Sequence, residues 1–87
     1  MKLNRNFLVH QAGTETLIVP TGRAGFAGVV KGNDTFGTIV RMLQNSTTED
    51  AIIARLQQTY TDPYKQIQKD VQHIVSELRK IGAIDDE

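Results

Sequence analysis

The sequence lacks cysteine, has few aromatic residues and carries no net charge. Without cysteine there can be no disulfides, no thiolate chemistry and no metal site built on cysteine. Ten lysine and arginine residues balance ten acidic residues, so no strong field gathers phosphate backbones or anionic lipid. The two tyrosines and three phenylalanines do not interleave with basic residues into a nucleic-acid-binding patch. We therefore expect neither nucleic acid nor membrane as a partner.

Long apolar runs are also missing. The run near the start, Phe7-Leu8-Val9, is far too short for the core of a signal peptide or for a membrane span. A cytoplasmic location is therefore expected. The 87 residues, 39% of them hydrophobic, suit a single domain over residues 1–87 with one modest core, but not a deep, enclosed active site.

The side chains that carry catalysis do not gather into a recognisable motif. His10 and His73 are far apart, and no HxxxH or HExxH spacing occurs. Neither Ser46 nor Ser76 sits in a GxSxG motif, and the acidic residues cluster at helix caps and in the tail. The sequence thus predicts a protein that is not an enzyme, with no catalytic residue, metal site or cofactor.

Three glycines, Gly22, Gly25 and Gly28, are spaced G-x-x-G-x-x-G beside Arg23. A phosphate-binding loop leads directly into a helix, whereas these glycines precede an expected strand, and no Gly-Lys-Ser/Thr follows. The pattern favours a flexible connection between strands.

The first third of the chain predicts three strands. Residues 7–12 and 15–19 are rich in apolar and β-branched residues, and the Gly13-Thr14 pair between them suits a tight hairpin turn. A third strand is expected at about residues 26–31, before Gly32-Asn33.

The rest of the chain predicts three helices. The first begins at a cap formed by Asn33 or Asp34 and contains Gly37, which we interpret as a position of close packing. The second opens at residues 46–50, where Ser46 with Glu49 fits a capping box and Thr47 with Asp50 fits it less well. The apolar stripes of these two helices are Phe36, Ile39, Val40 and Leu43, and Ile52, Ile53, Leu56 and Tyr60.

The third helix is expected to begin at Asp62-Pro63 and to end before Gly82, which is typical of a C′ residue. Ile84 is expected to fold back on the core, and residues 85–87 to form a solvated tail. The apolar stripe of this helix is Ile67, Val71, Ile74, Leu78 and Ile81.

This order predicts an α+β, winged-helix-like fold, with a three-stranded antiparallel sheet followed by three helices. The edges of so small a sheet carry unpaired backbone groups and can accept another strand. Because helix-turn-helix bodies often bind DNA, a winged-helix DNA-binding or transcription-linked protein is the alternative.

The candidate peptide-binding site combines an edge strand with a stripe on the third helix. Lys65 and Arg79 could pair with acids on the peptide, with Val75 in the floor of the groove. Periodicity alone favours a solvated helix face for the same stripe. The strand residues are Gly28, Val29, Val30 and Lys31, and the helix residues are Lys65, Gln68, Gln72, Val75 and Arg79.

Four stretches together form a family-like pattern through their order and spacing. They are residues 15–20, residues 32–36, residues 47–53 with Tyr60, and residues 70–84. This pattern resembles the PqqD-like family, the precursor-peptide recognition elements of ribosomal peptide biosynthesis. Two positions depart from it, because Gly32 replaces the usual leucine and Ile74 replaces an aromatic residue.

The resemblance implies a peptide-binding protein with no catalysis of its own. Members of this family bind the leader segment of a ribosomally made precursor as an added strand, between the third strand and the third helix. The partner implied is a peptide-modifying enzyme such as a radical SAM maturase. Synthesis of pyrroloquinoline quinone (PQQ) is the namesake pathway, and other peptide products are equally open.

Overall fold

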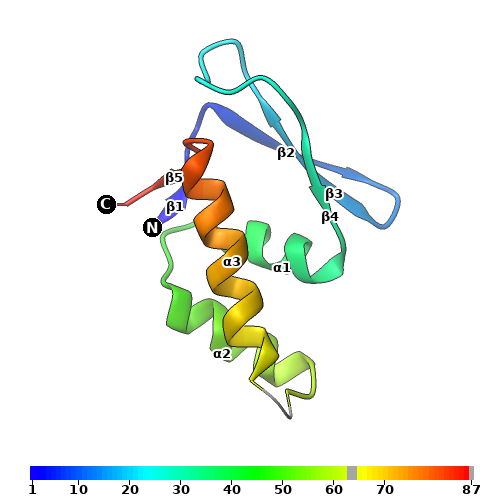
Figure 1. Ribbon diagram of the computed structural model, residues 1–87. Coiled ribbons are helices and arrows are strands. Elements are labelled where there is room, and N and C mark those ends of the chain that lie inside the picture. The colour runs from blue at the N-terminus through cyan, green and yellow to red at the C-terminus, as the bar shows by residue number, and fades with distance from the viewer. Residues whose placement is uncertain (63–64, 87) are drawn as a thin grey trace.

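The computed structural model describes residues 1–62 and 65–86. Within them, a three-stranded antiparallel sheet is followed by three helices, as the sequence predicts (Figure 1). The sheet consists of β2 (Phe7–Ala12), β3 (Glu15–Pro20) and β4 (Val30–Gly32). The helices are α1 (Asp34–Met42), α2 (Glu49–Thr59) and α3 (Gln66–Lys80), and a small ribbon consists of β1 (Lys2–Leu3) and β5 (Ile84–Asp85).

The β2–β3 hairpin forms at the predicted turn. Ala12 pairs with Glu15, which leaves Gly13 and Thr14 as a two-residue connection. Gly13 has φ +61°, a left-handed conformation that glycine adopts without a steric cost. The alternation along β3 then turns Thr16 and Ile18 into the core.

The third strand is much shorter than the predicted residues 26–31. Gly28 has φ +153°, outside the strand region, and a Cβ at this position would lie 3.3 Å from the ring of Phe26. Phe26 packs against the core instead of pairing with a neighbouring strand. Pairing therefore starts only at Val30, and the expectation of strand at residues 26–29 was wrong.

The helix caps agree with the sequence at α1 and differ at α2. The side chain of Asn33 accepts a hydrogen bond from the backbone N–H of Phe36 at 3.2 Å, as expected. At α2 the N-cap is Thr48, whose Oγ1 accepts from the N–H of Ala51 at 3.1 Å, rather than Ser46 or Thr47.

Helix α3 begins at Gln66, later than predicted. The N-cap residue is Lys65, without a side-chain cap hydrogen bond, so the predicted N-cap at Asp62 was wrong. Asp62 Oδ1 still accepts from the backbone N–H of Ile67 at 3.1 Å, and the predicted Pro63 lies outside the described residues. The other end is as predicted. Gly82 has φ +78°, its N–H donates to Arg79, and the N–H of Ala83 donates to Leu78, the pairing of a glycine-terminated helix.

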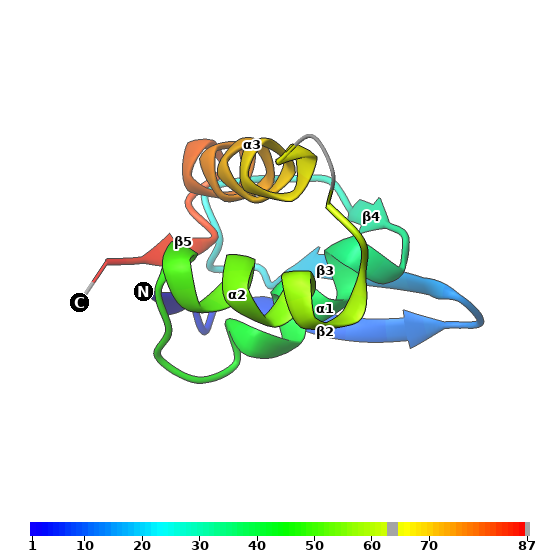
Figure 2. The same ribbon diagram turned by 90° about the horizontal axis from the view of Figure 1, so that it is seen from below.

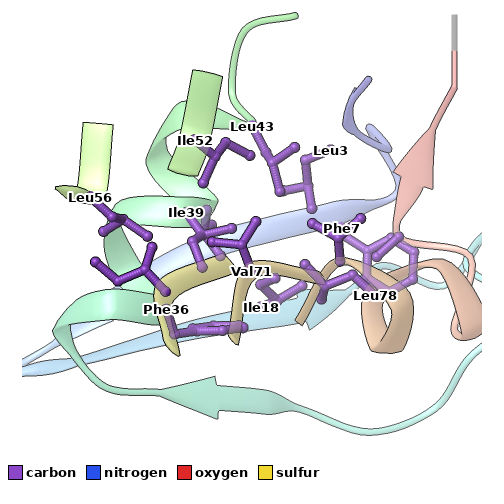
Figure 3. Close-up of a cluster of buried hydrophobic side chains, with 14 residues drawn as sticks. Leu3, Phe7, Ile18, Phe36, Ile39, Leu43, Ile52, Leu56, Val71 and Leu78 are labelled. Carbon is purple, nitrogen blue, oxygen red and sulfur yellow. The ribbon is translucent and has the colours of Figure 1, made fainter. Parts of the chain in front are cut away.

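One hydrophobic core lies between the inner face of the sheet and the three helices (Figure 3). Tyr60 was expected in the core but is 40% exposed. Helix α2 ends at Thr59, and the extended backbone of Tyr60 takes its side chain off the buried face of the helix. Within the described residues, no helix has the length and apolar character to cross a membrane. The buried apolar residues are Leu3, Phe7, Ile18, Phe36, Ile39, Val40, Leu43, Ile52, Leu56, Ile67, Val71, Val75, Leu78 and Ala83.

The strands β1 and β5 pair near the two ends of the chain. Asp85 was instead expected to belong to a solvated tail. Lys2 pairs with Asp85, and Leu3 pairs with Ile84. The side-chain amide of Asn4 also donates to Asp85 Oδ1 at 2.8 Å. Ile84 packs against the core as predicted.

Candidate functional site

Strand β4 lies at the edge of the sheet. Its residues Val30, Lys31 and Gly32 pair with β3, and no strand of the described residues pairs with the other side of β4. Backbone N–H and C=O groups on that side are therefore available to a further strand.

A hollow of about 290 Å³ lies between the end of β4 and helix α3. Asn33, the N-cap of α1, and Thr35 in its first turn form one wall, and Asp70, His73 and Ile74 of α3 form the other. Figure 2 shows α3 as a separate layer above α1 and α2. The hollow therefore lies beside α3, at the point where the edge strand β4 leads into α1.

Two of the four predicted strand residues occupy β4. Val30 lies opposite Ile18, on the inner face of the sheet, and Lys31 lies opposite Leu17, on the outer face. Gly28 and Val29 precede the strand, and Val29 is 57% exposed. Backbone pairing with a peptide is thus confined to the short segment that begins at Val30.

The predicted helix stripe lies on the wrong side of α3 to face β4. Arg79 Nη1 is 3.6 Å from Glu49 Oε1, at the start of α2. Gln72 and Gln68 continue the same ridge at helical spacing, so this ridge borders α2. The ridge therefore lies on the flank of α3 opposite to Asp70 and Ile74, which line the hollow beside Asn33.

Two more residues of that stripe lie apart from the hollow. Val75 is 0% exposed and belongs to the core, so it cannot form the floor of an open groove. Lys65 precedes the first turn of α3, with φ 55°.

Arg79 forms ion pairs with acidic residues of the same chain. Its Nη2 donates to Asp86 Oδ1 at 2.6 Å, and its Nε donates to Asp86 Oδ2 at 3.0 Å. These hydrogen bonds lower the pKa of the Asp86 carboxyl and raise the pKa of Arg79. Arg79 therefore ties the C-terminal segment to α3 instead of facing the groove.

The wall that does face β4 was missed in the sequence. Asp70, His73 and Ile74 lie on the other flank of the buried stripe, at the same helical spacing as the predicted ridge. Both flanks are polar, so periodicity alone does not choose between them. Within residues 1–62 and 65–86, no three potential metal ligands come together.

The fold is similar to that of two proteins solved in complex with leader peptides. "TbiB1 in Complex with the TbiA(beta) Leader Peptide" superimposes with a TM-score of 0.82 at 10% identity, covering 100% of this chain and 98% of the other. "Lasso peptide synthetase B1 complexed with the leader peptide" gives 0.75 at 22% identity, covering 94% and 93%. At such identities the likeness establishes the fold alone.

No curated protein matches the chain. The family model described as "Coenzyme PQQ synthesis protein D (PqqD)" matches residues 15–84, which is most of the sequence. The protein therefore belongs to the PqqD family.

Proposed function

We propose that this protein is a non-catalytic module that binds the leader segment of a ribosomally made precursor peptide and presents it to a separate modifying enzyme. The observation that carries the proposal is the free edge of β4 beside α3. A peptide that adds as a strand there would gain affinity from backbone hydrogen bonds and specificity from the wall of α3.

Membership of the PqqD family supports this proposal. So does the likeness in fold, over nearly the whole chain, to two proteins solved in complex with leader peptides. The partner enzyme would be a peptide-modifying maturase, such as a radical SAM enzyme, in PQQ synthesis or in another peptide pathway. The site of action would be the cytoplasm, where ribosomal precursors are made.

The mechanism would be tethering. Binding of the leader makes the encounter between the core peptide and the enzyme intramolecular, at an effective concentration on the order of millimolar for a short flexible linker. The module would thus raise the rate of modification without supplying a reacting group.

The alternative, a winged-helix DNA-binding protein, gains no support from the surface of α3. Arg79 is paired with Asp86 and Glu49, and Asp70 and Glu77 lie exposed on the same helix. Titration of labelled duplex DNA at low salt tests this alternative, and tight binding that weakens steeply with salt would support it.

Proline substitutions test the edge. Successive N–H groups along a strand point to opposite sides, so one of Val30→Pro and Lys31→Pro removes an N–H on the free edge and the other removes one that faces β3. We expect the free-edge variant to stay folded and to lose binding at least tenfold. The probe is a set of peptides selected on the wild-type protein from a display library of random 20-residue sequences.

The control is thermal unfolding of both variants. A variant that keeps the wild-type Tm and loses the selected peptides supports strand addition. If both variants fold and bind the peptides with unchanged Kd, the edge of β4 is not the binding site.

A further inference from the structure

We infer that the groove prefers a peptide with a basic residue, lysine or arginine, and that Asp70 is the residue that selects it. This inference rests on the proposed function, because it concerns the peptide bound at the same groove. It reverses the expectation from the sequence, in which Lys65 and Arg79 favoured an acidic peptide.

The first argument is the charge of the α3 wall. Asp70 lines the hollow at the end of β4, and none of the ion pairs among the described residues includes it. Its recorded partner is neutral, since Gln66 Nε2 donates to Asp70 Oδ1 at 2.9 Å. Within the part of the chain that the structure describes, no lysine or arginine forms an ion pair with Asp70.

The remaining walls of the hollow add no positive charge. Asn33 and Thr35 are uncharged, and the Asn33 side chain already accepts from the N–H of Phe36. Farther along the same flank of α3, Glu77 is paired with Lys80 at 3.1 Å, so these two charges largely offset each other. Among the residues that line the hollow, Asp70 is the one carboxylate, and the imidazole of His73 lies beside it.

The second argument is the apolar neighbour of Asp70. Ile74 lies one turn along the helix in the same hollow and is only partly buried. A lysine or arginine side chain has an apolar stem and a cationic end. The stem would lie along Ile74 while the end reaches the free carboxylate oxygen of Asp70, a combination that neither an acidic nor a short polar residue provides.

The basic residues on and near α3 do not line the hollow, so they do not favour an acidic peptide there. Arg79 is on the ridge that borders α2 and is bound to Asp86, and Lys65 precedes the helix. Lys69 and Lys80 also lie on α3, and Lys31 lies in β4, but none of these lysines lines the hollow. An acidic side chain in the hollow would therefore meet Asp70 rather than these cations.

The test compares charge-matched variants in the same peptide selection. Asp70→Asn removes the groove carboxylate and keeps the side-chain shape. Asp50→Asn removes an exposed carboxylate from the first turn of α2, outside the hollow. Asp70→Lys reverses the charge. Each protein is used to select from the library of random 20-residue peptides, and Kd values are then measured by fluorescence anisotropy.

We expect lysine and arginine to be enriched at one position of the peptides selected on the wild-type and Asp50→Asn proteins. The enrichment should vanish with Asp70→Asn and change to aspartate and glutamate with Asp70→Lys. For a wild-type-selected peptide, Asp70→Asn should raise Kd about two- to fivefold, a modest change because exposed ion pairs are weak, and added salt should shrink it.

Failure of the inference differs from failure of the proposed function. Peptides that require the free edge of β4 but show no basic preference, or keep that preference with Asp70→Asn, would overturn the inference and leave the proposed function standing. A library that yields no peptide dependent on that edge would overturn both.

Discussion

At the scale of single residues, two glycines set how closely α1 approaches the sheet. A Cβ on Gly37 would lie 2.6 Å from Thr16 Oγ1, and a Cβ on Gly32 would lie 2.5 Å from side-chain carbons of Phe36. Phe36 therefore occupies the space beside position 32, where the PqqD-like pattern usually has leucine. Gly32, without a side chain, leaves room for the ring of Phe36 in the first turn of α1.

We expect Gly37→Ala to lower the free energy of unfolding by about 1–2 kcal/mol in urea titrations. Alanine favours a helix by about 1 kcal/mol over glycine, but overpacking costs about 1–3 kcal/mol and outweighs that gain. Thr16 cannot easily turn away, because it is buried and its Oγ1 donates to Gln11 Oε1 at 2.8 Å.

The control for this prediction is Thr16→Ala, which removes the clashing oxygen. The double variant should be more stable than the sum of the two single effects implies. A Gly37→Ala protein more stable than wild type would show that the helix is not held this close to β3.

Close packing at Gly37 was predicted from the sequence, and the structure confirms it. Its partner Thr16 was not predicted, because the contact depends on how α1 crosses the sheet. The same limit applies to Asp70 and Arg79. Both are exposed polar positions on α3, and only the tertiary arrangement decides which faces β4 and which faces α2.

At the scale of elements, local signals predicted the kinds of structure better than their boundaries. The β2–β3 hairpin was predicted because a turn pair separates two apolar strands. The β4 boundary was wrong because Gly28 gives no sign in the sequence of its φ of +153°. The α2 cap was ambiguous because Ser46, Thr47 and Thr48 are all good cap residues.

The hydrogen bonds of Asp62 give a prediction at this scale. Asp62 Oδ1 accepts from the N–H of Ile67, and its Oδ2 accepts from Gln57 Nε2 at 3.2 Å, so this side chain joins the end of α2 to α3. Asp62→Ala should cost about 1 kcal/mol of stability, measured by chemical unfolding. Peptide Kd should change less than twofold, because the groove wall lies farther along the helix.

Asp62→Asn provides the matched control, since its side-chain oxygen can still accept from Ile67. It should retain most of the wild-type stability. A large loss of peptide affinity with Asp62→Ala would show instead that the start of α3 contacts the peptide.

At the scale of the whole molecule, the core fixes the position of α3 and therefore the groove. Val71, Val75 and Leu78 are buried, and Arg79 fastens the C-terminal segment through Asp86. The α+β fold was predictable, because the order of elements and their apolar stripes suffice to define it. The groove was predictable only in part, since the free edge follows from topology while its facing wall depends on the rotation of α3.

The most direct test of strand addition is an NMR experiment on labelled protein with an unlabelled, library-selected peptide. The account predicts cross-strand nuclear Overhauser contacts between the peptide and residues 30–32 of β4, with shift changes at Asp70 and Ile74 and little change at Gln72 and Arg79. Contacts with the other edge of the sheet, on β2, or changes centred on the ridge of Gln72 and Arg79, would contradict it.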